Sequence, residues 1–481
     1  MAASDSQVAD IRIEHADDIR VIPRPSERRR TNDDVIMVDV SATTDGAPRL
    51  DRDERGFGFV LLIAGTAAAI AFGALGLTGA LPTTAGLFLV PAFLIGNWFV
   101  LNRFVRNVAG AGFVTIATAG LALRYLAAAP RMYGGVDSLD YQVSGERLAT
   151  SFRSFDFIVD TGRSIPGTGS LRYLAGIVNV LTGSHFLATF LVFTSLALWG
   201  QVWFLLSCRP VLTQRQFRLA TMLLMVWPSL AFWPSSIGKE SAALFGLGLV
   251  ALGASKLLRR ELAGLLILVM GIAAVGLIRP HVAMIALAGL LAGALARQTG
   301  SRKGLGGQVI LVVMVTVGAM LLTDASASLF GLEQLDGLQD VTAALDFTQD
   351  RTSQDQSQFV APRVESVVDY PWAFATVILR PFPWEADSVT ALITGLEGMV
   401  LLALLLIAIP GLIAEVGAIF TRGILLYSVA FTAIFVFLFS AVGNFGILSR
   451  QRAQVLPFVL LIAAIGLAHE RYTRTETSAA R

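Results

Sequence analysis

The sequence predicts an all-α polytopic membrane protein with about 12 transmembrane helices. Of its 481 residues, 54% are hydrophobic and only 15% are charged, whereas soluble domains carry about 25% charged residues. The apolar residues gather in segments near the length of about 20 residues that a helix needs to cross a bilayer. Lysine and arginine recur in alternate connections between these segments, which is the pattern of cytosolic loops.

The first 55 residues differ from the rest of the chain. They are polar, carry charges of both signs, and lack the apolar core of a signal peptide. This composition predicts a disordered cytosolic tail over 1–55, which serves either as an inert leader or as a docking or regulatory segment. The predicted transmembrane domain covers 56–470, and a short cytosolic tail covers 471–481.

Twelve apolar segments follow the tail. They lie at about 57–77, 85–102, 108–128, 184–207, 217–233, 239–255, 262–279, 282–297, 306–323, 391–414, 424–442 and 453–468. The count has a margin of one or two, because the second, fifth and sixth are short or interrupted. Every connection that faces the cytosol in this order carries a lysine or arginine. The positive-inside rule therefore predicts a multi-pass protein of the cytoplasmic membrane with both termini in the cytosol.

The outward face carries two sizeable loops, at about 129–170 and 324–390. The apolar stretch 171–181 is too short to span, which predicts an interfacial or re-entrant helix that returns the first loop to the membrane. Three short outward turns contain the sequences WPSSIGKE, IRPH and GNFGILSRQR. Charged groups at membrane depth are usually functional, so these turns are candidate sites.

Cations at the ends of the outward spans predict an anion site. The candidate phosphate-binding residues are Lys239, Arg279, His281, Arg380 and Arg450. Guanidinium groups hold phosphate or pyrophosphate by paired hydrogen bonds, and a lipid pyrophosphate places its head at this depth. The alternative is interfacial anchoring, in which Lys239 reaches the headgroups and Glu240 favours the first turn of its helix.

Acidic residues on the outward face are candidate general bases. Asp137 and Asp140 are three residues apart and share one face of a helix that starts near Ser138. Asp140 is the preferred base for an acceptor hydroxyl, and Glu385 is the second candidate. The alternative for the aspartates is a helix cap or an ion pair with Arg147. One cysteine and four scattered histidines favour a site without metal or cofactor.

The predicted topology resembles that of the O-antigen polymerases and O-antigen ligases, which are of the GT-C type. The segments WPSSIGKES and GNFGILSRQRAQ are similar to segments of polymerase-like envelope proteins. The resemblance implies a metal-free transfer in which Arg279, Arg380, Arg450 and Arg147 bind the undecaprenyl pyrophosphate leaving group. Ligases are expected to carry a histidine in the large outward loop, and 324–390 has none. This difference favours a polymerase or another GT-C transferase.

The sequence therefore predicts a membrane glycosyltransferase or polysaccharide polymerase. It would act on a polyprenyl-(pyro)phosphate-linked saccharide at the outer face of the cytoplasmic membrane. The expected partners are that donor, a glycan acceptor, membrane lipid and other envelope-assembly proteins, but not nucleic acid. Two alternatives remain: a transporter or flippase of lipid-linked or anionic solutes, and a non-catalytic envelope scaffold. The nearly uncharged span interiors and the lack of a half-to-half repeat argue against transport.

Overall fold

The computed structural model describes residues 48–50, 83–259, 261–296, 313, 349, 358–362, 364 and 366–469. All described residues belong to the unit Ala47–Arg481. Within the described residues the secondary structure is helical, apart from one isolated bridge between Gln358 and Asn444. The predicted all-α class is confirmed. The predicted spans at 57–77 and 306–323, apart from residue 313, lie outside the described residues. The tail 471–481 and all of the N-terminal tail except 48–50 lie outside them as well.

Helices account for most of the described residues. In chain order they are α2 (Thr83–Phe104), α3 (Arg106–Ala109), α4 (Ala111–Gly134), α5 (Val136–Arg153), α6 (Thr168–Thr182), α7 (Phe186–Cys208), α8 (Gln214–Val226), α9 (Pro228–Phe232), α10 (Lys239–Leu258), α11 (Ala263–Ile278), α12 (Pro280–Ala296), α15 (Tyr370–Phe374), α16 (Val389–Thr421), α17 (Gly423–Phe439), α18 (Phe445–Arg452) and α19 (Leu456–Leu467). Short 3-10 turns occupy Arg209–Val211, Val367–Asp369 and Pro383–Glu385, and a π-helical turn occupies Ala375–Leu379.

Four of these helical segments are long and apolar enough to cross a membrane. They are Ala111–Met132, Phe186–Val211, Lys239–Leu258 and Val389–Thr421. The helices α18 and α19, bent by 62° at their junction, would make a fifth span together. Other predicted spans correspond to shorter apolar helices of 10–17 residues. The structure thus supports an α-helical membrane protein, but its described part offers four or five spans by length and composition, not the predicted count of about 12.

Proline marks two breaks between consecutive helices. The predicted span 217–233 is divided into α8 and α9, because Pro228 restricts Trp227 to extended backbone (φ −62°, ψ 124°). Pro280 likewise starts α12 directly after Arg279, which takes φ −147° and ψ 81° at the end of α11. The first break divides a predicted span, whereas the second coincides with the predicted IRPH turn.

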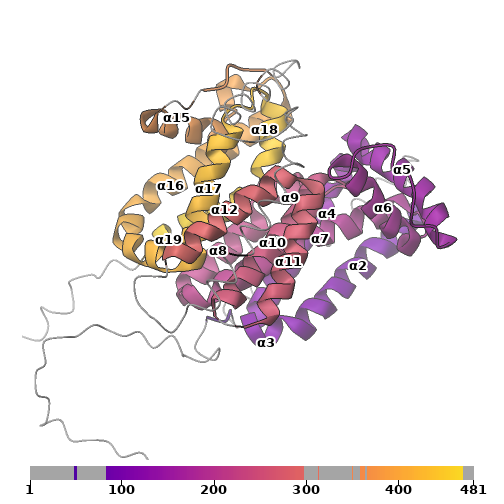
Figure 1. Ribbon diagram of the computed structural model, residues 1–481, viewed down its shortest axis with the longest axis horizontal. Helices are drawn as coiled ribbons and strands as arrows, with labels where there is room; N and C mark the ends of the chain where they lie inside the picture. The colour runs from indigo at the N-terminus through magenta and orange to yellow at the C-terminus, as the bar shows by residue number, and fades with distance from the viewer. Residues whose placement is uncertain are drawn as a thin grey trace, which may run out of the picture. The chain divides into compact units, whose positions relative to one another are not determined.

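Close helix packing organises the bundle. The helix α10 packs against both α7 and α11, while α12 packs against α17 and α16 against α19 (Figure 1). Glycines allow the closest approach: a Cβ added to Gly248 of α10 would lie 2.0 Å from the carbonyl oxygen of Gly200 on α7. Such small-residue contacts are typical of helix pairs in membranes.

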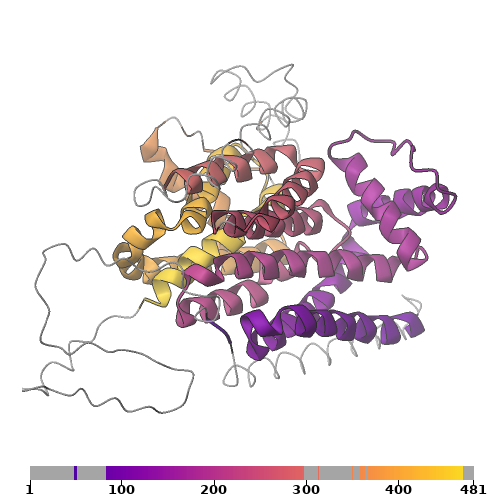
Figure 2. The same ribbon diagram turned by 60° about the horizontal axis from the view of Figure 1, so that its bottom comes forward.

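The helices α5 and α6 form a hairpin at one end of this bundle (purple, at the right of Figure 2). The α5 helix packs mainly against α6, and α6 in turn contacts α7, α10 and α11. The predicted short helix over 171–181 lies within α6, so its helical conformation is confirmed. The hairpin carries the first outward loop to the starts of α10 and α12, where the polar residues converge.

Candidate functional site

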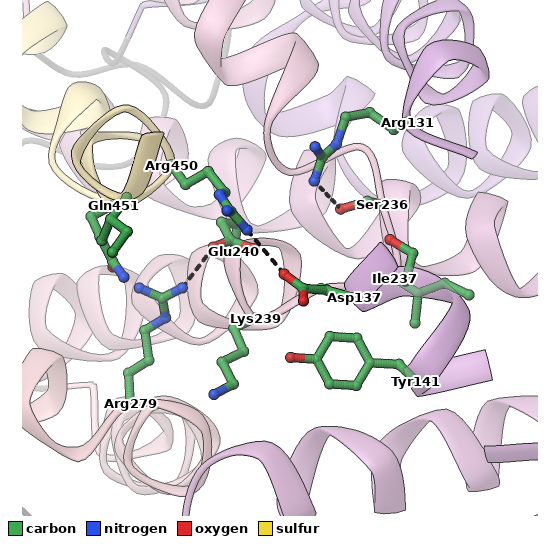
Figure 3. Close-up of a pocket in the computed structure, with 13 residues that line it drawn as sticks. Arg131, Asp137, Tyr141, Ser236, Ile237, Lys239, Glu240, Arg279, Arg450 and Gln451 are labelled. Atoms are coloured by element: carbon green, nitrogen blue, oxygen red, sulfur yellow. Dashed lines mark hydrogen bonds and ion pairs between the residues drawn. The ribbon is translucent and has the colours of Figure 1, made fainter. Parts of the chain in front are cut away.

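A pocket of about 210 Å³ lies where five separate segments meet (Figure 3). These segments are the end of α4, the start of α5, the turn into α10, the α11–α12 junction and α18. Its charged lining residues are Arg131, Asp137, Lys239, Glu240, Arg279 and Arg450. Four cations against two carboxylates give the pocket an excess of two positive charges. It is therefore suited to an anion.

The pocket brings together segments that the sequence analysis had assigned to one face. WPSSIGKE contributes Lys239, IRPH contributes Arg279, and GNFGILSRQR contributes Arg450, while the first loop contributes Asp137. Three of the six predicted phosphate-binding residues thus share one cavity. Because no membrane is present in the structure, the side on which this cavity opens stays a prediction.

Arg279 is the most deeply buried cation of the pocket, with 5% of its surface exposed. Its Nη2 donates a hydrogen bond to Glu240 Oε1 at 2.7 Å. Within the part of the chain that the structure describes, its Nε and Nη1 are buried without a hydrogen-bond partner. Burial lowers the pKa of Arg279, although the neighbouring Glu240 carboxylate acts to raise it. Unsatisfied donors on a buried cation are expensive and point to a missing acceptor.

Lys239 and Glu240 begin α10 and turn to different partners. The Lys239 Nζ donates to Thr168 Oγ1 at 2.9 Å, which joins the start of α10 to the start of α6. Glu240 lies in the first turn of α10, as predicted, but its carboxylate also pairs with Arg279. Lys239 and Glu240 therefore both belong to the pocket lining.

Asp137 and Arg450 form an ion pair across the pocket, from α5 to α18 (Figure 3). The Arg450 Nη1 lies 3.0 Å from Asp137 Oδ2, and the two side chains are 39% and 67% exposed. One turn further along α5, Tyr141 also lines the pocket. Burial, and secondarily the charge of Asp137, raises the pKa of Tyr141 to about 12, so its hydroxyl stays protonated at neutral pH.

Sequence reasoning did not identify Arg131 as a pocket residue. Its guanidinium carbon lies 5.2 Å from the ring centre of Trp233 and 5.5 Å from that of Phe232. Its Nη2 also donates to Ser236 Oγ at 3.4 Å. The aromatic pair before the α10 turn was the available signal, because exposed arginines often stack on such rings. The indole ring of Trp233 therefore stacks with a cation of the protein itself.

The structure places Asp140 outside the pocket. The Arg172 Nη2 lies 2.8 Å from Asp140 Oδ1 and 2.9 Å from Oδ2, so the carboxylate is held by a residue of α6. This ion pair ties α5 to α6. Arg147, the partner considered from sequence, is exposed on α5 and does not line the pocket.

Arg380 and Glu385 also lie outside the pocket lining and pair with each other. The Arg380 Nε is 3.0 Å from each oxygen of Glu385. The guanidinium carbon lies 4.3 Å from the ring centre of Phe359 and 5.0 Å from that of Phe445. The remaining predicted ligand, His281, stands in the first turn of α12 with its ring centre 5.9 Å from that of Phe439, and it is not among the lining residues either.

The Glu385 ion pair predicts a pH-dependent stability. Burial acts to raise the pKa of Glu385, but hydrogen bonds from Arg380 and from the Phe382 amide bring that pKa below its usual value. A carboxylate whose pKa is lowered on folding stabilises the fold above its unfolded pKa of about 4.3 and loses this effect as the pH falls. We expect Glu385→Gln to lower the melting temperature at pH 7 and to match the wild type near pH 3. Equal melting temperatures at pH 7 would contradict this prediction.

Groups of three or more histidine, cysteine, aspartate or glutamate side chains that could hold a metal ion are absent from the described ranges. The pocket offers cations and two carboxylates, of which Glu240 is committed to Arg279. It therefore resembles a site for an anionic ligand. Comparison of the chain with known protein families, curated proteins and solved structures finds no significant match.

Proposed function

We propose that this chain is a membrane glycosyltransferase or polysaccharide polymerase that uses a polyprenyl-(pyro)phosphate-linked saccharide. The observation that carries the proposal is Arg279, a buried guanidinium that lines the pocket and has two nitrogens without an acceptor among the described residues. The excess of two positive charges around it matches the charge of a phosphate or pyrophosphate. The resemblance to O-antigen polymerases supports the same donor class and a site at the outer face of the cytoplasmic membrane.

The proposed reaction is displacement at the anomeric carbon of the donor sugar. The acceptor hydroxyl oxygen forms the new bond to carbon, while the bond from that carbon to the phosphate oxygen breaks and its electron pair stays on phosphate. Arg279 and Lys239 stabilise the negative charge that develops on the leaving group, because they already face the pocket in fixed positions.

A carboxylate in the pocket is the best candidate to accept the proton of the acceptor hydroxyl. Asp137 takes this role in the proposal, because Arg450 engages only its Oδ2 and the side chain lines the cavity. Asp140, the base preferred from sequence, has both oxygens bound by Arg172 and lies outside the lining. Glu385 is likewise committed to Arg380.

The test is the replacement of Arg279 by glutamine, which keeps the polar shape and removes the charge. We expect a loss of polymer of about 100-fold or more, as for other fixed donors to a leaving group or oxyanion. The measurement compares total polymer and accumulated lipid-linked intermediates in a strain that lacks the gene and expresses the variant. Arg103→Gln, an exposed cation on α2 outside the pocket, is the matched control and should support normal polymer.

The intermediates separate the alternatives. A single polyprenyl-linked repeat unit would identify a polymerase, and a glycan that lacks one residue would identify a transferase. Normal polymer in both Arg279→Gln and Lys239→Gln, with the proteins present in the membrane, would overturn the proposal. Movement of the labelled donor across the membrane without a new glycosidic bond would instead identify a transporter or flippase.

A further inference from the structure

We propose that Arg450 is shared between Asp137 and the anionic ligand, so that ligand binding frees Asp137 to act as the base. This inference rests on the proposed function and adds a control step to the same pocket. In the structure the guanidinium of Arg450 is bound to Asp137. Since both residues line the cavity, an anion placed there competes with the Asp137 carboxylate for Arg450.

The two ion pairs of the pocket differ in how easily they exchange partners. The side chains of Arg279 and Glu240 are 6% and 11% exposed, whereas those of Arg450 and Asp137 are 39% and 67% exposed. Exposed ion pairs are weak because water screens them and because two long side chains must be held in one position. A phosphate presents more charge and more acceptor atoms to a guanidinium than one carboxylate does. Arg450 is therefore the cation that changes partner, while Arg279 keeps Glu240.

The exposed pair joins two separate walls of the pocket. Asp137 lies in the first turn of α5, which packs mainly against α6. Arg450 lies on α18, a helix of eight residues before the 62° bend into α19. Because both side chains are partly exposed, Arg450 can change partner by a rotation of its side chain.

The exchange orders the two events of the proposed reaction. Before the ligand binds, Arg450 Nη1 occupies the Oδ2 atom of Asp137. After the phosphate takes Arg450, the carboxylate stands beside Tyr141 with its charge uncompensated by that arginine, and it can accept the proton of the acceptor hydroxyl. Binding of the donor phosphate thus releases Asp137 Oδ2 when the leaving group is in place.

The test is a double-mutant cycle on the binding of inorganic pyrophosphate to the purified full-length protein. If Asp137 competes for Arg450, Asp137→Asn should tighten pyrophosphate binding by at least about threefold in the wild-type background. In the Arg450→Gln background the same change should have a smaller effect, because the shared cation is gone. A merely structural Asp137 would give weaker binding when replaced, and a general charge effect would be equal in the two backgrounds.

The possible outcomes distinguish the exchange at Arg450 from the proposed glycosyltransferase function. Measurable binding by the wild type that is abolished in Arg279→Gln, together with tighter binding by Asp137→Asn and loss of polymer in that variant, supports both. Binding that depends on Arg279 but shows no coupling between Asp137 and Arg450 overturns the inference and leaves the function standing. No pyrophosphate binding by the folded wild type contradicts the proposed function itself. Asp156→Asn, an exposed acid outside the pocket, is the matched control and should bind as the wild type does.

Discussion

Replacing Arg124 by leucine is expected to destabilise the folded protein by about 3 kcal/mol or more. Arg124 is fully buried within the candidate span Ala111–Met132. Its Nη1 donates to the carbonyl oxygen of Met225 at 2.8 Å, and its Nη2 donates to that of Leu224 at 3.1 Å and to Gln201 Oε1 at 2.5 Å. A leucine leaves these three buried acceptors without their donor, and each such group costs about 1–3 kcal/mol.

The position of those acceptors explains why a cation is tolerated there. Leu224 and Met225 lie in the last turn of α8, which ends before Pro228 and so leaves carbonyl groups without helical partners. A positive charge at a helix C-terminus is also favoured by the helix dipole. Arg124 therefore fixes the end of α8, and α9 connects this end to the start of α10 at Lys239. Loss of Arg124 should displace these pocket residues as well as destabilise the fold.

Thermal unfolding of the purified protein in detergent measures the effect. Arg103→Leu is the control, because Arg103 is exposed on α2. Arg124→Lys should be intermediate, since lysine keeps the charge but cannot reach several acceptors as a guanidinium does. If Arg124→Leu unfolds at the wild-type temperature, the carbonyl groups have other partners and the explanation is wrong.

The features predicted correctly from sequence are those determined by local residues. Apolar runs predicted helices, and the IRPH turn was expected where Pro280 separates α11 from α12. The described part has four or five candidate spans instead of about 12, because several apolar runs form helices of only 10–17 residues. The segment 217–233 contains Pro228, and the short α19 follows a bend of 62°.

Ion-pair partners were predicted less well, because the choice of partner depends on how helices pack. The sequence suggested an ion pair between Asp140 and Arg147, but these residues lie two turns apart on α5. Asp140 instead pairs with Arg172 of α6. Asp137 and Asp140 look alike in sequence, and only the rotation of α5 determines that Asp137 lines the pocket. The gathering of Lys239, Arg279 and Arg450 was predictable, since charge alternation had assigned their turns to one face.

Substitution by alanine should have different effects on stability at two glycines of α16, Gly411 and Gly417. A Cβ on Gly411 would lie 1.9 Å from the carbonyl oxygen of Gly466 on α19, which is backbone and cannot move aside alone. A Cβ on Gly417, six residues later, would meet nothing within 4 Å. Gly411→Ala should therefore destabilise by about 1–3 kcal/mol through overpacking. Gly417→Ala should be neutral or stabilising by up to about 1 kcal/mol, because alanine favours helix.

Unfolding both variants side by side in detergent tests this contrast with one chemical change in one helix. Gly466→Ala serves as the reciprocal variant, since its Cβ would lie 2.5 Å from the carbonyl oxygen of Ala408 on α16, and it should also destabilise. If the Gly411 and Gly417 variants unfold alike, α16 and α19 are not in the close contact described. The contact also bears on function, because α19 continues from α18, which carries Arg450. A forced separation of α16 and α19 should therefore weaken pyrophosphate binding in Gly411→Ala and leave it unchanged in Gly417→Ala.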